Sequence, residues 1–555
     1  MAIRGRRAAR GRSTAVTGSV SPVDGAIADA VRPASRDETR PVALAAVVVA
    51  FIAFMVSYLR GYILLYGDAV AHLGIARRIL DSHNPGLSQL GGVWLPLPHL
   101  LLLPFVQRMA WWQTGLAGAW PSMACYVLGC AGIYRLARMW LRPSAAIIAA
   151  LFYAVNPGLL YMQTTAMTEP LFLAEMIWGA LLIAEHGRAL KRGKQRRASR
   201  LLVVAGLVLV GAIFTRYDGW IYAAFAWLVV AWGIRRHLRE RVGGAFALFT
   251  ALLIAAPAMW LAYNAKQFGD PLDFIRGPYS AKAIDARTTA PRAPHYPGWH
   301  SMRVASLYFL KASEVGAVPL RWANLLLWLS VTGSAIAIWK WRKEGITAAL
   351  LLWIPLPFYA YSIAYGSVPI FIPLWWPHSW YNVRYGMEML PVFALFLAFV
   401  VAELAELARR HWPRSEMWVV SIAAVLIVVN SVVLMRGRPL VLQEAVANAR
   451  TRIPYEQSLA KALAELPEQG KILMYTSEHP GALQRAGIPL KRTINEGDYY
   501  QWPGALEHPA QSAAVIVTTE GDAVARAVAA HPEGLTMVDV ICSTGQPCAR
   551  IYLAK

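Results

Sequence analysis

The chain is a succession of long apolar runs separated by short polar segments. Each run approaches the roughly 20 residues that a helix needs to cross a bilayer. We predict eleven membrane-spanning helices, and a chain of 555 residues that is 57% hydrophobic and only 15% charged agrees with them, since soluble proteins average about 25% charged residues. The predicted spans are residues 41–66, 113–134, 144–162, 169–186, 201–215, 220–234, 243–263, 317–339, 347–366, 386–408 and 416–435.

The basic residues give these spans an orientation. The net charge is +22, but Lys and Arg cluster between spans rather than along one soluble face, which argues against nucleic acid and favours anionic membrane lipids as partners. With a cytoplasmic N-terminus, every cluster falls on one side, as the positive-inside rule requires. We therefore predict a multi-pass protein of the inner or plasma membrane. The clusters are residues 135–142, 188–200, 235–241, 340–343 and 409–414.

The N-terminal end differs from the apolar middle. Residues 1–40 are rich in Arg, Ala, Ser and Gly and lack apolar periodicity, which predicts a disordered basic cytoplasmic tail. They do not resemble a signal peptide, because the first apolar run begins too late and is too long. Residues 41–438 then form the transmembrane domain.

The C-terminal end changes character again. After an amphipathic helix at about 441–466, short β-like runs alternate with a helix-like stretch. Residues 439–555 therefore predict a small extracytoplasmic α/β domain with no more than about three or four strands. Cys542 and Cys548 lie in it, and an oxidising compartment permits a disulfide between them.

The first two segments on the outer side carry candidate acids. The segment after the first span is semi-apolar and rich in proline, so we expect short helices along the membrane surface. Asp68 ends the first span, where a partly desolvated carboxylate suits a general base, although a solvated helix-end Asp would give the same pattern. His72 follows one turn later. Glu169 opens the fourth span, either as a second active-site acid or, with Thr168, as a helix cap.

The segment before the tenth span combines aromatic residues with an arginine. Arg384 stands at a helix N-terminus, where a cation opposes the helix dipole unless an anion binds there. That placement predicts a phosphate site. The alternative is an aromatic belt with one Arg that extends to the headgroups. Weaker substrate-binding candidates beside it are His378, Tyr381, Asn382 and Tyr385.

Three further candidates lie in other outer loops. Arg216 and Asp218 form the tip between the fifth and sixth spans, where charges are costly and often functional, or else pair with one another. Tyr279 belongs to the long loop 264–315, which we expect to be a substrate-binding lid. The sequence has neither a Gly-rich phosphate loop nor a dinucleotide fingerprint.

Three features in this order resemble the GT-C glycosyltransferases, within them the branch of protein O-mannosyltransferases and lipid A aminoarabinose transferases. The resemblance covers about residues 42–435. It implies a polyprenyl-phosphate-linked sugar donor and inverting transfer of a hexosyl or pentosyl group outside the membrane, with the acceptor open between protein, lipid and glycan. The features are Asp68 after the first span, Thr168-Glu169-Pro170 at the fourth and Asn382-Val383-Arg384-Tyr385-Gly386 at the tenth.

The resemblance also implies roles. Asp68 would be the general base, Glu169 a second acid that orients acceptor or donor, and Arg384 the ligand of the donor phosphate. The branch often has two adjacent acids in the first loop, whereas Ala69 follows Asp68 here. A divalent metal ion held by the two carboxylates and His72 therefore stays open.

Two other functions compete with the enzyme. A transporter or flippase of lipid-linked sugars would place charges near mid-membrane and repeat its helices, whereas the ionisable residues concentrate here at one membrane face. A non-catalytic subunit of envelope assembly would not need the acidic pair.

Overall fold

The computed structural model describes residues 38–290, 293–466, 470–477, 479 and 481–555. The predicted tail, 1–40, therefore lies almost entirely outside the described residues. Thr39–Lys555 form one compact unit that holds both the apolar helices and the C-terminal sheet. The predicted division into residues 41–438 and 439–555 stays a prediction.

Each predicted span coincides with helix, so the polytopic α-helical fold is confirmed. In the described part of the chain, eight helical segments are long and apolar enough to cross a membrane, and three shorter apolar helices accompany them. The helices of the spans are α2 (Thr39–Leu59), α6 (Leu116–Ala137), α7 (Pro143–Ala154) with α8 (Pro157–Met162), α9 (Glu169–Lys191), α10 (Gln195–Thr215), α11 (Asp218–Ile234), α12 (Arg241–Phe268), α16 (Ala323–Trp341), α17 (Thr347–Leu350) with α18 (Pro355–Tyr365), α19 (Leu390–His411) and α20 (Ser415–Arg436).

Helix α9 differs from the other spans. It is not among the eight segments found in the described residues, because it carries Glu169, Glu175 and Glu185. Most of its residues are buried, and it packs between α6 and α10. Protein rather than lipid therefore surrounds its carboxylates, which removes the cost of exposing them to hydrocarbon.

The loops between the spans are themselves helical. The first loop forms α3 (Gly67–Leu80), η1 (Leu87–Leu90), α4 (Pro96–Val106) and α5 (Met109–Thr114), which agrees with the predicted short helices. The long loop contains α13 (Asp273–Arg276), α14 (Ala281–Thr288) and α15 (Met302–Ala317). The sequence pattern did not predict α15, which packs against α18 and against η5 (Val383–Met389).

The C-terminal domain is α/β, as predicted, but it has five strands in the order β2-β1-β3-β5-β4, so the expected three or four were too few. Strands β1, β2 and β3 pair in parallel, and β5 joins β3 and β4 antiparallel. Cys542 and Cys548 form a disulfide across the β4–β5 turn. The elements are α21 (Leu440–Ala464), β1 (Ile472–Met474), α22 (Gly481–Ala486), η6 (Leu490–Arg492), β2 (Thr493–Ile494), α23 (Trp502–Glu507), α24 (Pro509–Ser512), β3 (Val515–Thr519), α25 (Ala523–Ala530), β4 (Leu535–Ser543) and β5 (Gln546–Ala554).

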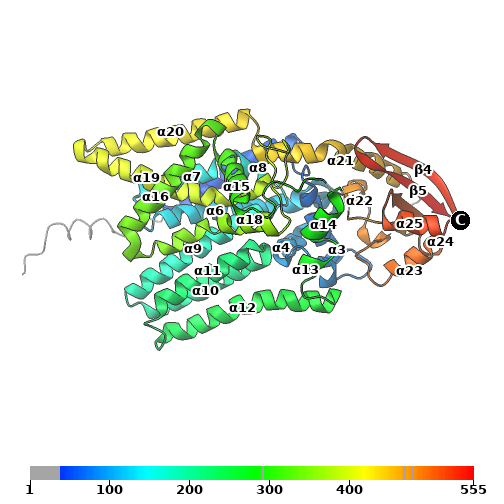
Figure 1. Cartoon of the computed structure of the whole chain (residues 1–555), viewed down its shortest axis with the longest axis horizontal. Coiled ribbons are helices and arrows are strands. Elements are labelled where there is room, and N and C mark those ends of the chain that lie inside the picture. The colour runs from blue at the N-terminus through cyan, green and yellow to red at the C-terminus, as the bar shows by residue number, and fades with distance from the viewer. Residues whose placement is uncertain (1–37, 291–292, 467–469, 478, 480) are drawn as a thin grey trace, which may run out of the picture. The chain divides into compact units, whose positions relative to one another are not determined.

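Helix α21 connects the apolar bundle to this domain (Figure 1). Hydrogen bonds join the domain to the first loop. The backbone N–H of Leu490 donates to Asp81 of the first loop over 3.3 Å, and Gln89 donates to the carbonyl of Gly497 over 3.0 Å. The C-terminal domain therefore rests on the helices that carry Asp68.

The connections between helices agree with the predicted sidedness. Figure 1 shows the α11–α12 and α19–α20 turns at the end of the bundle away from the strands. Two of the basic clusters, 235–241 and 409–414, lie in these turns. The side of the membrane that faces the cytoplasm stays a prediction.

Candidate active site

The structure brings Asp68, Glu169 and Arg384 together. Asp68 lies in the first turn of α3, Glu169 in the first turn of α9 and Arg384 in η5. Arg384 Nη2 lies 2.6 Å from Asp68 Oδ2, and its Nε lies 3.2 Å from Glu169 Oε1. A carboxylate in the first turn of a helix gains from the positive end of the helix dipole. The Arg384 side chain is only 9% exposed, so it does not extend to headgroups as the alternative required.

A third carboxylate approaches the same guanidinium. Glu444 of α21 places Oε1 3.7 Å from Arg384 Nη1 and accepts a 2.7 Å hydrogen bond from the Tyr66 hydroxyl. The rings of Tyr66 and Tyr385 lie 5.5 and 4.9 Å from the guanidinium carbon, within the range of cation–π attraction. The sequence offered no signal for Glu444, because an acid in an amphipathic helix is usually solvated.

A second guanidinium, that of Arg216, stands behind the first. It lies 3.5 Å from Glu169, 3.4 Å from Asp218 and 3.2 Å from Glu388. Arg216 and Asp218 thus pair, but within a larger network rather than as an isolated ion pair. Glu388 lies inside a predicted apolar span. An acidic residue in an apolar span is often functional, so the sequence did carry a signal for it.

The Tyr359 hydroxyl connects the residues around Arg216. It accepts a 2.7 Å hydrogen bond from Arg216 and lies 2.7 Å from Glu388 Oε1 and 3.0 Å from Asp218 Oδ2. Thr168 occupies the N-cap position of α9, but its side chain makes no capping hydrogen bond to the helix and instead accepts a 2.9 Å hydrogen bond from Arg216. The network therefore joins α9, α11, α18 and η5.

Carboxylates outnumber guanidiniums in this network. Asp68, Glu169 and Glu444 surround Arg384, while Asp218 and Glu388 accompany Arg216. The site therefore holds no surplus positive charge. An anion that binds to Arg384 must compete with a carboxylate that is already there.

A cavity of about 1170 Å³ opens beside Asp68 and Arg384. The C-terminal domain supplies part of its wall, through Glu496 and its neighbours, and α14 and the loop before η5 supply other parts. This volume exceeds that of most small-molecule pockets, about 300–1,000 Å³, and accommodates more than one substrate. Besides Asp68 and Arg384, four of the weaker predicted candidates line it: Tyr279, Tyr381, Asn382 and Tyr385.

The described wall of the cavity includes neither His72 nor His378. His72 is buried, and its Nδ1 lies 2.9 Å from His99 Nε2 in a hydrogen bond. Burial lowers the pKa of His72 to about 3, and the nearby Arg384 acts in the same direction. Its ring packs 4.4 Å from that of Trp94, which does line the cavity. His378 is exposed, and its Nδ1 lies 3.1 Å from the backbone carbonyl oxygen of Pro373.

The open question of a metal has a structural answer at this site. Among the described residues, no group of three or more His, Cys, Asp or Glu side chains is arranged to hold a metal ion. The oxygens of Asp68 and Glu169 nearest the centre instead meet Arg384. The residues therefore do not fit a divalent ion, and no step below uses one.

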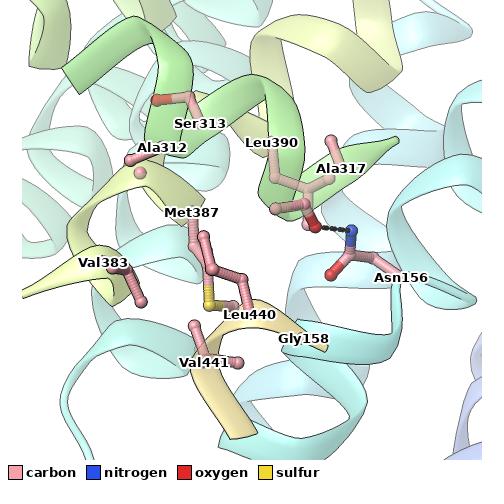
Figure 2. A pocket seen from close by; sticks show the side chains of 12 residues that line it. Asn156, Gly158, Ala312, Ser313, Ala317, Val383, Met387, Leu390, Leu440 and Val441 are labelled. Carbon is pink, nitrogen blue, oxygen red and sulfur yellow. Dashed lines mark hydrogen bonds between the residues drawn. The ribbon is translucent and has the colours of Figure 1, made fainter. Parts of the chain in front are cut away.

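Helices α15 and α21 pack tightly against η5. A cavity of only about 10 Å³ lies between η5, α15 and α21, with room for about one water molecule at most, and Figure 2 shows the side chains that line it. Met387, Leu440 and Val441 pack around it, and the Asn156 amide donates a 3.1 Å hydrogen bond to the carbonyl of Gly316. The segment η5, which carries Arg384, therefore has little room to move toward α15 or α21.

The sequence is similar to those of known glycosyltransferases. Residues 104–260 match the dolichyl-phosphate-mannose-protein mannosyltransferase family. An undecaprenyl phosphate-alpha-4-amino-4-deoxy-L-arabinose arabinosyl transferase of Pseudomonas aeruginosa is 27% identical over 303 residues, 51% of this chain and 50% of that protein. A protein of the same description from Photorhabdus laumondii is 24% identical over 410 residues, 67% of this chain and 68% of that protein. The chain thus spans about half the length of the first of these relatives.

The fold is also found among solved structures. ArnT from Cupriavidus metallidurans bound to undecaprenyl phosphate has a TM-score of 0.52 and 15% sequence identity, over 92% of this chain and 97% of that one. At this identity the likeness concerns the fold alone. Together with the related sequences, it confirms the predicted resemblance to GT-C glycosyltransferases of the aminoarabinose transferase branch.

Proposed function

We propose that the chain is an inverting glycosyltransferase of the inner membrane. It takes a sugar from a polyprenyl-phosphate-linked donor and transfers it to an acceptor on the extracytoplasmic side. One observation carries the proposal: Asp68 and Arg384 meet at the wall of a large cavity, with Glu169 directly behind them. The related arabinosyl transferases, whose description names an undecaprenyl phosphate donor, support it.

The chemistry is a single displacement at the anomeric carbon. Asp68, whose side chain is 41% exposed, accepts the proton of the acceptor hydroxyl. The acceptor oxygen forms a bond to the anomeric carbon as the bond from that carbon to the phosphate oxygen breaks. The electron pair leaves with the polyprenyl phosphate, and Arg384 stabilises the charge that develops on it.

Glu169 has a different position from Asp68 and therefore a different role. Its side chain is 0% exposed and lies between the guanidiniums of Arg384 and Arg216. We assign it to holding Arg384 in place rather than to contact with acceptor or donor. Arg216 and Asp218 form the next layer behind it and are positioning residues of the same kind.

The charge of the cavity wall indicates which kind of acceptor fits. Its carboxylates come from several elements and include Asp273, Asp285 and Glu496, against the single further cation Arg78 among the described lining residues. Such a wall suits a hydroxyl-rich acceptor more than a highly anionic one.

The test is sugar transfer in membranes from cells that produce each variant. Labelled polyprenyl-phosphate hexoses and pentoses are added, and label is measured in the protein, lipid and glycan fractions. Asp68→Asn should abolish transfer, and Arg384→Gln should lower it by about 10²–10³-fold. Asp539→Asn, at an exposed residue of β4 that is not among the described residues lining the cavity, is the control and should stay within about twofold. Near-normal transfer by Asp68→Asn, or no transfer by the wild type into any fraction, refutes the proposal.

A further inference from the structure

The three carboxylates around Arg384 are not equivalent. Glu169, Glu444 and Asp68 face its Nε, Nη1 and Nη2 respectively. The side chains of Glu169 and Glu444 are 0% and 1% exposed, whereas that of Asp68 is 41% exposed. Every nitrogen of the guanidinium thus faces a carboxylate, and only the partner of Nη2 also reaches water.

We propose that the donor phosphate and Asp68 are alternative ligands of Arg384 Nη2, so that donor binding displaces Asp68 and must precede activation of the acceptor. This inference rests on the proposed function and adds to it an order of binding and two positioning residues. Glu169 and Glu444 are the fixed partners of the guanidinium, and Asp68 is the exchangeable one.

Burial decides which partner exchanges. A buried carboxylate that loses its cation is left uncompensated, at a cost of several kcal/mol in known proteins. Glu444 is held further by the Tyr66 hydroxyl at 2.7 Å. Asp68 lines the cavity, so its carboxylate can turn into water and recover its hydration.

Charge makes the exchange necessary. Three carboxylates already share one guanidinium, and a phosphate that joined them would be a fourth anion within a few ångströms. Like charges at that distance repel strongly where solvent is excluded. Departure of Asp68 relieves this repulsion and also frees Nη2, the guanidinium nitrogen whose partner is exposed.

The exchange links the two halves of the reaction. While Arg384 donates a 2.6 Å hydrogen bond to Asp68 Oδ2, the ion pair holds the carboxylate at the guanidinium, so the carboxylate cannot turn toward an acceptor hydroxyl. When the phosphate occupies Arg384, Asp68 is released beside the new leaving group. The base therefore becomes available at the place and time at which the donor is bound.

The test is equilibrium binding of undecaprenyl phosphate to the purified full-length protein in nanodiscs. Asp68→Asn and Asp68→Ser remove the competing carboxylate, so both should bind the lipid about tenfold or more tighter than the wild type, as expected for release of a charge-assisted hydrogen bond. The matched control Asp285→Asn removes a negative charge from the same cavity without contact to Arg384. It should change affinity by less than about threefold, because its effect is screened.

The outcomes separate the exchange from the proposed function. If the wild type binds the lipid but neither Asp68 variant binds it more tightly than Asp285→Asn does, the exchange is refuted while the function stands. If the wild type does not bind the lipid at all, the function itself fails. A structure of the wild-type complex checks the geometry independently. A phosphate oxygen should take the position of Asp68 Oδ2 at Nη2, and an intact Asp68–Arg384 pair beside a bound phosphate would overturn the inference.

Discussion

Gly386→Ala tests whether close backbone packing positions Arg384. Gly386 lies in η5, two residues beyond Arg384, and faces α15. A Cβ at this position would lie 2.7 Å from the backbone nitrogen of Ser313 and 2.8 Å from the carbonyl carbon of Ala312. Non-bonded heavy atoms pack comfortably at about 3.5–4.0 Å. Because the obstacles are backbone atoms, η5 itself must move by roughly 1 Å.

Two costs follow from this movement. Overpacking a well-filled region destabilises a protein by about 1–3 kcal/mol. The same shift lengthens the 2.6 Å hydrogen bond from Arg384 to Asp68 beyond good hydrogen-bond distance, and it lengthens the 3.2 Å ion pair of Arg384 with Glu169. A reacting group misplaced by about 1 Å loses on the order of 10²-fold in rate. We therefore expect a lower unfolding temperature together with a loss of transfer out of proportion to it.

Gly316→Ala is the matched control. Gly316 lies on the neighbouring helix α15 beside the same small cavity, but a Cβ there meets nothing within 4 Å. Replacement of glycine by alanine inside a helix stabilises it by about 0.5–1 kcal/mol. Thermal unfolding in detergent and transfer in membranes are measured for both variants. Wild-type stability and transfer in Gly386→Ala would refute the packing argument.

Two further predictions concern the buried groups around the site. Tyr359→Phe removes the hydroxyl shared by Arg216 and Glu388 and should destabilise the protein by about 1–3 kcal/mol in denaturant unfolding, whereas Tyr361→Phe, at a residue 61% exposed, should not. His72 has a folded pKa of about 3 against an ordinary 6.5, so the unfolded chain binds its proton more readily. Its contribution to stability should be complete above about pH 6.5 and fall as the pH falls toward 3; His72→Gln should flatten the pH dependence in that window, and an unchanged slope would contradict the assignment.

The secondary structure was predictable wherever neighbouring residues in the sequence determine it. An apolar run of about 20 residues must form helix in a bilayer, because every backbone polar group has to be satisfied within the segment. That is why each predicted span, from residues 41–66 to 416–435, coincides with helix. Helix α15 escaped prediction because it packs against α18 and η5 within a long polar loop, and strand β2 because two residues carry no periodicity.

The sequence by itself determined the spanning helices and their order, and that Glu169 and Arg384 stand where spans begin. Asp68, predicted at the end of the first span, instead lies in the first turn of the separate helix α3, because α2 ends at Leu59. Only the tertiary structure decided what surrounds them. Asp68 and Arg384 are 316 residues apart, and their contact depends on how α3 and η5 pack. Glu444 and Glu388 joined the site by packing alone. The hydrophobic requirement of a bilayer acts residue by residue along the chain, whereas the placement of buried charges depends on partners that only folding brings within reach.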